Sequence, residues 1–212
     1  MTRRCTGVIL AGGQATRYGG RPKGLELVGG KRVIDRVVEA LASGTDDLLL
    51  IANDANASEW LPGVRVERDL RPACGSLGGI HAALAHAQGD VIVVAWDMPF
   101  VTQRLVEALR AFGELADVVV AESDSKRGVE PLCAYYSGRC LAPVERRLDQ
   151  GERRVVSFFD DVKVARIAAS EVATLGDPAF MFMNINSPGD LTLAEQHASS
   201  TDGGHSRPKA SR

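Results

Sequence analysis

Short apolar runs alternate with amphipathic segments through the first two-thirds of the chain. The runs predict strands at residues 8–11, 48–51, 64–67, 91–95 and 118–120. Between them, apolar residues recur at helical spacing and predict helices over 33–41, 80–87 and 105–109, with a turn-rich stretch at 72–79. Strands that alternate with helices are typical of a mainly parallel sheet with right-handed crossovers. We therefore predict an α/β fold with three layers and a doubly wound, mainly parallel sheet.

The last third of the chain has a less regular pattern. It predicts strands at 132–136 and 162–167, the first of which could run antiparallel, and helices over 141–148 and 155–159. A final helix is predicted to open at Ser187. Ser187 is a favourable N-cap, Pro188 suits the first helical position, and Asp190 can complete a capping box.

We expect one domain over residues 1–198, followed by a tail. The length of 212 residues suits a single domain, and neither an internal repeat nor an interdomain linker interrupts the pattern. From Ser199 the composition shifts to Ser, Gly, Lys and Arg without apolar periodicity. Because such a segment has no apolar face to bury, we expect residues 199–212 to be disordered.

Composition and charge exclude several classes of protein. The chain is 45% hydrophobic, which is enough for a sizeable core. Its formal net charge of −2 argues against a general nucleic-acid-binding protein, which would be strongly basic. No apolar run approaches the length of a membrane span, and the N-terminus has no signal-peptide core before the first strand. We therefore expect no membrane partner and a cytoplasmic location.

The spacing of cysteines and histidines predicts no metal site. No two cysteines form a C-x-x-C pair, and none stands at zinc-like spacing from a histidine. His81 and His86 are five residues apart in a helical pattern, so they share a helix face poorly. We interpret the histidines as packing or surface residues and the cysteines as reduced, mostly buried thiols. The cysteines are Cys5, Cys74, Cys133 and Cys140.

The first predicted strand leads into a glycine-dense loop that carries three cations. Residues 12–24 contain Arg17, Arg21 and Lys23 among five glycines. Glycines let backbone N–H groups approach an anion closely, and the cations balance the charge of a polyphosphate. A strand that ends in such a loop predicts a binding site for a nucleotide phosphate. The alternative is a solvated glycine-rich turn between a strand and a helix.

The spacing within the loop excludes two common phosphate motifs. The Walker A pattern fails because Leu25 and Arg32 stand where it requires glycine and Ser or Thr, and the Rossmann pattern fails because Gly12 and Gly13 are adjacent. What remains is L-A-G-G-x-x-x-R-x-G-x-x-x-K-G, from Leu10 to Gly24. This loop resembles the signature of nucleotidyltransferases that activate a phosphorylated acceptor with an NTP. The doubled glycine is most similar to the molybdenum cofactor guanylyltransferases.

The predicted strands place further polar groups where a ligand belongs. In a parallel sheet, ligands bind beyond the carboxyl ends of the strands. The Gly12 loop, Asn53, Asp69 and Asp97 all follow predicted strands closely. Asp97 could hold Mg²⁺, which uses few protein carboxylates when it binds a nucleotide. The alternatives are a helix N-cap or a turn former for Asp97, and ordinary turn residues for Asn53 and Asp69.

The resemblance extends over nearly the whole chain before Ser199 and implies roles for particular residues. It implies a Rossmann-like nucleotidyltransferase fold, with Arg17, Lys23 and Asp97 catalytic and with Mg²⁺ on Asp97. The nucleotide-binding residues that it implies are Leu10, Ala11, Gly12, Gly13, Lys23, Asn53, Asp69, Gly78 and Asp97. Two positions depart from the family's pattern: Ser76 stands where proline is usual, and Trp96 stands where a small residue is common.

The resemblance also implies an acceptor site in the last third of the chain. The G-E-R-R-V run supplies Arg153 and Arg154, and the N-x-N segment supplies Asn184 and Asn186. The alternatives are a solvated, charged helix start for the arginines and a capping turn for Asn186.

The activity implied is transfer of GMP from GTP to Mo-molybdopterin, which forms the molybdopterin guanine dinucleotide cofactor and pyrophosphate. The partners implied are GTP, molybdopterin, other proteins of molybdenum-cofactor biosynthesis and target apoenzymes. One rival interpretation is a CTP-dependent molybdopterin enzyme or another small-molecule nucleotidyltransferase. A second is a non-catalytic nucleotide-binding adaptor with the same fold.

Overall fold

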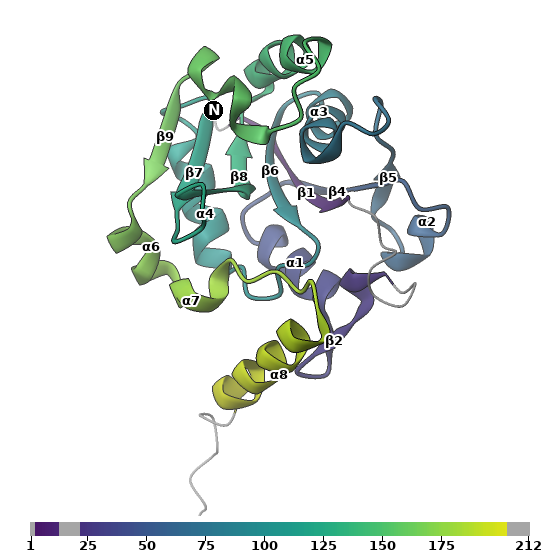
Figure 1. Ribbon diagram of the computed structural model, residues 1–212, viewed down its shortest axis with the longest axis vertical. Coiled ribbons are helices and arrows are strands. Elements are labelled where there is room, and N and C mark those ends of the chain that lie inside the picture. Colours follow the sequence, from purple (N-terminus) through teal and green to yellow (C-terminus); the bar gives the residue numbers. More distant parts are fainter. Residues whose placement is uncertain (1–2, 13–21, 203–212) are drawn as a thin grey trace, which may run out of the picture.

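The computed structural model describes residues 3–12 and 22–202, and these form an α/β fold (Figure 1). The strands of the main sheet are β1 (Cys5–Ala11), β4 (Asp47–Ala52), β5 (Arg65–Glu67), β6 (Asp90–Ala95), β7 (Val118–Glu122), β8 (Val129–Tyr136) and β9 (Val164–Ile167). The helices are α1 (Val33–Ala42), α2 (Ala57–Trp60), α3 (Gly75–Ala87), α4 (Gln103–Phe112), α5 (Leu141–Asp149), α6 (Ala169–Leu175), α7 (Pro178–Met181) and α8 (Pro188–Asp202). Short 3₁₀ turns are η2 (Lys23–Leu25), η3 (Gly138–Cys140) and η4 (Val155–Asp161), and β2 (Leu27–Val28) pairs with β3 (Lys31–Arg32).

Within the described residues, the seven strands form one mainly parallel sheet in the order β5-β4-β1-β6-β8-β7-β9. Only β8 runs antiparallel to its neighbours β6 and β7. Leu10 lies opposite Ile51 of β4 and Ala95 of β6, so the carboxyl ends of these three strands share one edge. The predicted doubly wound sheet is confirmed, and so is the antiparallel strand in the last third of the chain.

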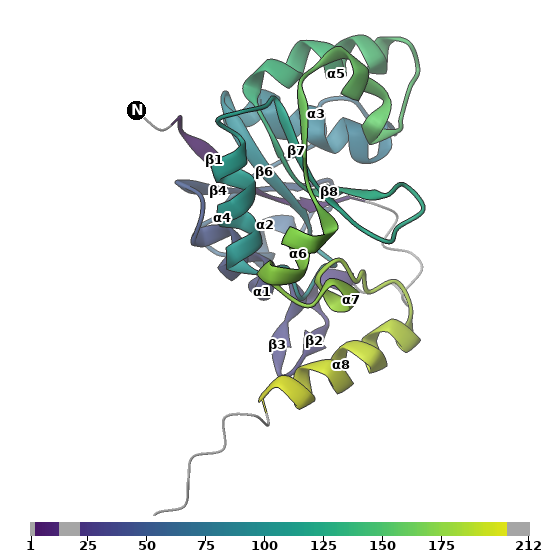
Figure 2. The ribbon, with the colours of Figure 1, turned by 90° about the vertical axis from the view of Figure 1, so that its left-hand side faces the viewer.

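Residues along each strand alternate between two hydrophobic cores, one on each face of the sheet. The sheet and the helices over its two faces therefore form three layers. Ile9 of β1 belongs to the core beneath α1, α4 and α6. Its neighbours Val8 and Leu10 belong to the core beneath α3, α5 and η4. Because these strands are buried on both faces, their sequences are continuous apolar runs. Figure 2 shows the sheet between the two helical layers.

A smaller unit lies next to the helical layer that contains α1. Helix α8 packs against the β2–β3 pair through a separate apolar cluster that includes Val28, Ile185 and Ala198, and both views show this unit below α1 (Figures 1 and 2). The domain boundary expected after Ala198 falls inside this helix, because α8 continues to Asp202. The helical conformation of residues 199–202 differs from the expected disorder at the start of the tail. The division into a domain and a tail stays a prediction, and residues 203–212 lie outside the described part of the chain.

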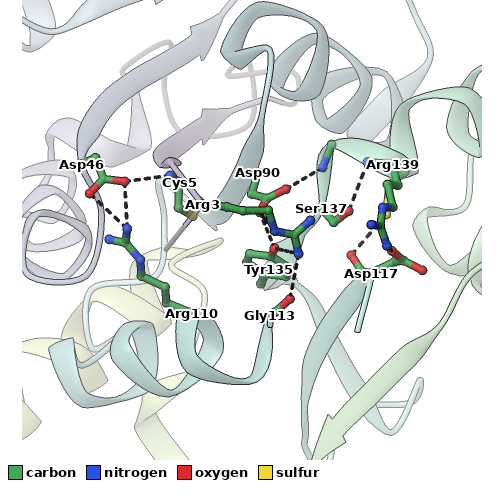
Figure 3. A network of polar contacts seen from close by, with 12 residues as sticks. Arg3, Cys5, Asp46, Asp90, Arg110, Gly113, Asp117, Tyr135, Ser137 and Arg139 are labelled. Carbon is green, nitrogen blue, oxygen red and sulfur yellow. Dashed lines mark hydrogen bonds and ion pairs between the residues drawn. The ribbon is translucent and has the colours of Figure 1, made fainter. Parts of the chain in front are cut away.

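The opposite edge of the sheet is closed by a network of ion pairs and hydrogen bonds (Figure 3). The buried Asp90 carboxylate accepts hydrogen bonds from the Tyr135 hydroxyl at 2.7 Å and the Gly138 amide at 2.9 Å, and Arg3 lies 3.2 Å away. On the same edge, the Asp46 carboxylate accepts from the Cys5 amide at 2.8 Å. These contacts lie at the amino ends of β1, β4 and β6 and at the carboxyl end of the antiparallel β8, opposite the strand ends that carry Asn53 and Asp97.

Two predicted elements differ from the structure. Helix α3 begins at Gly75 rather than Ile80, because the glycines in the predicted turn fit a helix packed closely on β1. A Cβ at Gly79 would lie 2.4 Å from Leu10 Cδ1, so this position requires glycine for packing. The segment predicted as a helix at 155–159 is a 3₁₀ turn, η4.

Candidate functional site

The carboxyl ends of β1, β4 and β6 bring three predicted site segments together. Gly12 follows β1, Asn53 follows β4, and Asp97 lies two residues beyond β6. The Trp96 amide donates to the Leu10 carbonyl at 3.2 Å, which fixes the end of β6 to the start of the glycine-rich loop. Gly13 and Arg17, which were predicted to bind phosphate, lie outside the described residues.

Lys23 reaches this edge from the 3₁₀ turn η2. Its Nζ donates to Asn186 Oδ1 at 2.7 Å, a contact between residues 163 positions apart. Its charge also acts on Asp97, where it opposes the rise in the pKa of the carboxyl group. The structure therefore brings together Lys23, Asp97 and Asn186, and the roles predicted for them stay predictions.

Asp97 is a partly buried carboxylate. Burial raises the pKa of Asp97 above its usual value, because desolvation penalises the charged form, while Lys23 lowers it. The Asp97 carbonyl accepts from the Ile185 amide at 2.9 Å, so the segment before α8 is held against the end of β6. A desolvated carboxylate that gains stability from nearby positive charge suits a divalent cation.

Asn53 and Asp69 bind each other. Asn53 Nδ2 donates to Asp69 Oδ2 at 2.8 Å, and the Asp69 amide donates to Asn53 Oδ1 at 3.0 Å. This reciprocal pair joins the loops after β4 and β5. The two residues predicted separately therefore form one polar unit at the edge of the sheet.

A capping box holds Asn186 in place. Asp190 Oδ2 accepts from the Ser187 amide at 2.8 Å and from the Asn186 amide at 2.9 Å, and the Asp190 amide donates to Ser187 Oγ at 3.2 Å. The predicted cap is confirmed. The contact with the Asn186 amide adds a second role, because Asp190 also orients the residue that meets Lys23. The Asn184 side-chain nitrogen donates to the Phe182 carbonyl at 3.1 Å.

Arg153, Arg154 and Gly78 lie on other elements. The two arginines are exposed and follow α5, and Arg154 lies 3.4 Å from Glu152. Arg153 and Arg154 belong to the helical layer that contains α3, whereas Asn184 and Asn186 lie shortly before α8. Gly78 is buried inside α3, where a Cβ would lie 2.7 Å from the Cβ of Cys74. Helix packing therefore accounts for the glycine at this position.

The model of the MobA-like NTP transferase domain matches residues 7–164 of this chain. The chain belongs to this family. The match begins in β1 and ends at the first residue of β9, so it covers the strands that form the site edge. The chain is a nucleotidyltransferase of the MobA-like family.

Relatives in the family are similar over most of their length. A molybdenum cofactor guanylyltransferase of Desulfosudis oleivorans is 36% identical over 193 residues, which cover 90% of this chain and 94% of the relative. One of Vibrio campbellii is 32% identical and covers 87% and 91%. The crystal structure of molybdopterin-guanine dinucleotide biosynthesis protein A from Archaeoglobus fulgidus has a TM-score of 0.77 at 30% identity, with 92% of this chain and 99% of that chain covered.

Family membership agrees with the chemistry of the described residues. Enzymes of this family generally use a divalent metal, and Asp97 offers a carboxylate for one. Across residues 3–12 and 22–202, no group of three or more His, Cys, Asp or Glu side chains could hold a metal by itself. Magnesium sites that bind nucleotides commonly use one or two carboxylates together with phosphate oxygens and water. None of the helices in the same residues is long and apolar enough to span a membrane.

Two features of the site are not visible in the sequence. The capping motif predicts the role of Asp190 in the helix cap but not its contact with the Asn186 amide, which lies outside the helix. The position of Trp96 in the sequence shows a departure from the family's pattern but not what the ring contacts. In the structure Trp96 is buried and stacks on Trp60, with ring centroids 5.0 Å apart.

Replacing Asp190 with Ala is expected to destabilise the protein by about 1 kcal/mol at pH 7, as loss of a helix cap does. The amides of Asn186 and Ser187 and the Ser187 hydroxyl lower the pKa of Asp190. Its contribution is therefore present at neutral pH and is lost as the pH falls through that lowered pKa. Urea unfolding of both proteins between pH 7 and pH 3 measures the difference. Asp190→Glu is the control, since glutamate also completes a capping box, and a difference that grows toward low pH would contradict the assignment.

Proposed function

We propose that the chain transfers GMP from GTP to the terminal phosphate of Mo-molybdopterin and releases pyrophosphate. The observation that carries the proposal is the convergence of Lys23, Asp97 and Asn186 at one sheet edge, in a chain similar to guanylyltransferases over most of its length. An oxygen of the acceptor phosphate attacks the α-phosphorus of GTP, and the bond to the β-phosphate breaks. No protein nucleophile is required.

Catalysis in this scheme is positioning and charge neutralisation. Lys23 and Arg17 contact the triphosphate, and the backbone of residues 10–13 approaches it closely. The Asn53–Asp69 pair lies beside the nucleoside. The family resemblance also assigns Gly78, which is buried in α3, to the nucleotide site. Lys23 already bonds Asn186, so its ammonium is held at the edge before a ligand arrives.

Asp97 is the proposed ligand of Mg²⁺. Its partly buried carboxylate fits a hard cation that prefers oxygen ligands. The ion, when bound, neutralises charge on the phosphates and draws electron density from the α-phosphorus. Asp97 is fixed for this task because its own carbonyl is bonded to the Ile185 amide.

The acceptor is proposed to contact Asn184 and Asn186 on one side and Arg153 and Arg154 on the other. Guanidinium groups suit an acceptor phosphate, since they form paired hydrogen bonds with its oxygens. The two pairs come from different layers of the fold, so a ligand that meets both would have to span the edge of the sheet. We further propose a cytoplasmic location and contacts with other proteins of cofactor biosynthesis and with target apoenzymes.

The proposal is tested by comparing GTP, CTP, ATP and UTP. Thermal shift with Mg²⁺ should show the largest rise in melting temperature for GTP, because a ligand that binds the native state stabilises it. Release of pyrophosphate should then require both GTP and molybdopterin. A preference for CTP would favour the cytidylyl alternative, and binding without pyrophosphate release would favour the non-catalytic adaptor.

Asn186→Ala is expected to impair use of the acceptor more than binding of GTP. The side chain lies beside Lys23 but is exposed, so it remains available to a second ligand. We expect a roughly tenfold rise in KM for the acceptor, the scale of one lost hydrogen bond to a charged group. Steady-state kinetics with each substrate varied in turn measures this. Equal losses for GTP and the acceptor would place Asn186 in the nucleotide site instead.

A further inference from the structure

Trp96 contacts the segments that carry Lys23, Asp97 and the start of the glycine-rich loop. It directly precedes Asp97, and its amide is bonded to the Leu10 carbonyl at 3.2 Å. Its indole ring lies against the backbone of Gly24, the residue after Lys23. A Cβ at Gly24 would lie 2.5 Å from Trp96 Cε3 and 2.9 Å from Cδ2, so the ring occupies the space of a side chain there.

The ring itself is held in one position. Trp96 is 5% exposed, and it stacks on Trp60 with an angle of 23° between the rings. Trp60 ends α2, and its carbonyl accepts from Arg32 Nη1 at 3.0 Å, while Asp35 pairs with the same guanidinium. A buried, stacked indole has little rotamer freedom, so it is a rigid surface for the turn that carries Lys23.

We infer that Trp96 is a positioning residue that sets Lys23 relative to Asp97. The inference rests on the proposed function, because it assumes that Lys23 and Asp97 act on one nucleotide. Trp96 is linked to both groups. Asp97 is the next residue in the chain, and Lys23 precedes Gly24, whose backbone packs against the indole. A displacement of about 1 Å between catalytic groups costs up to a hundredfold in rate. The flat ring thus controls the spacing of the cation and the carboxylate.

Because the indole packs on Gly24, the effect of a substitution at Gly24 on kcat/KM should depend on the side chain at position 96. Gly24→Ala should lower kcat/KM for GTP roughly tenfold or more, because the new methyl group collides with the indole and shifts the Lys23 turn. Trp96→Phe removes Cε3 and Cζ3, two of the three ring atoms that this methyl group would meet. The double variant should therefore be more active than Gly24→Ala alone. Two losses that simply multiply would show that the residues act independently and would overturn the inference.

Trp60→Phe is the matched control. It keeps an aromatic ring beside Trp96, and the atoms nearest to a Cβ at Gly24 belong to Trp96, which the substitution leaves in place. We expect Trp60→Phe to keep kcat/KM within about twofold, while Trp96→Phe loses roughly tenfold, mainly in kcat. Equal losses in the two variants would indicate that the stack serves stability alone. Melting temperatures of all variants identify any that fail to fold.

Fluorescence supplies a readout that does not depend on turnover. The chain has two tryptophans, so Trp60→Phe leaves Trp96 as the single indole fluorophore. Adding GTP with Mg²⁺ and without the acceptor should change its emission, because the ligand meets the turn that packs on the ring. Calorimetry in parallel separates the possible failures. If GTP does not bind, the proposed function fails; if GTP binds and Trp96 emission is unchanged, only the positioning role fails.

Discussion

Replacing Asp97 with Asn is expected to lower metal-dependent guanylyl transfer by at least about a hundredfold, the scale of losing a key electrostatic contact in an active site. The triphosphate and the acceptor phosphate repel each other, and without a bound cation that repulsion opposes the geometry of attack. Asparagine keeps the shape of the side chain but removes its charge. Pyrophosphate release measured over a range of Mg²⁺ concentrations should recover only in part.

The same substitution should leave the melting temperature without ligand nearly unchanged. Burial raises the pKa of Asp97, so the folded protein disfavours the charged form and loses little when the charge is removed. Asp124→Asn removes an exposed carboxylate between β7 and β8 and should leave transfer unchanged. Full activity of Asp97→Asn at low Mg²⁺ would remove this residue from the mechanism, and unfolding would favour a structural role.

Replacing Lys23 with Ala is expected to weaken GTP binding and slow transfer together. The substitution removes the ammonium that bonds Asn186 and acts on Asp97, so kcat/KM should fall roughly tenfold to a hundredfold, as for a lost hydrogen bond between charged groups. Steady-state kinetics gives the loss in transfer, and calorimetry gives the loss in affinity.

Lys31→Ala is the matched control for Lys23. Lys31 lies on β3 and pairs with Glu39, so its removal lowers the net charge equally without touching the site edge. A similar loss in the two variants would mean that GTP responds only to overall charge. Lys23→Arg should recover part of the binding, because it keeps the charge but places it differently.

The fold was predictable because its strands are buried on both faces. Continuous apolar runs such as Leu48 to Ile51 are typical of strands of that kind, and their alternation with helices indicates a parallel sheet. Parallel strands share a carboxyl edge, so the sequence also predicted that Asn53 and Asp97 would lie near the Gly12 loop.

Contacts between residues far apart in the chain could not be predicted from the sequence pattern. Nothing in the local pattern indicates that Lys23 bonds Asn186, or that Asn53 and Asp69 pair with each other. The early start of α3 was missed because glycines normally interrupt helices, whereas here Gly79 allows the helix to approach Leu10. Tertiary packing decided that case against local propensity.

The hydrogen bond between Lys23 and Asn186 can form only after residue 186 has been synthesised. The last described strand of the sheet ends at Ile167. Synthesis from the N-terminus therefore completes all seven strands of that sheet before Asn186 is added to the chain. A nascent chain of intermediate length could form the sheet while Lys23 still lacked its partner. Because domains fold as they emerge during synthesis, the charge arrangement at the sheet edge is finished only after the scaffold that carries it.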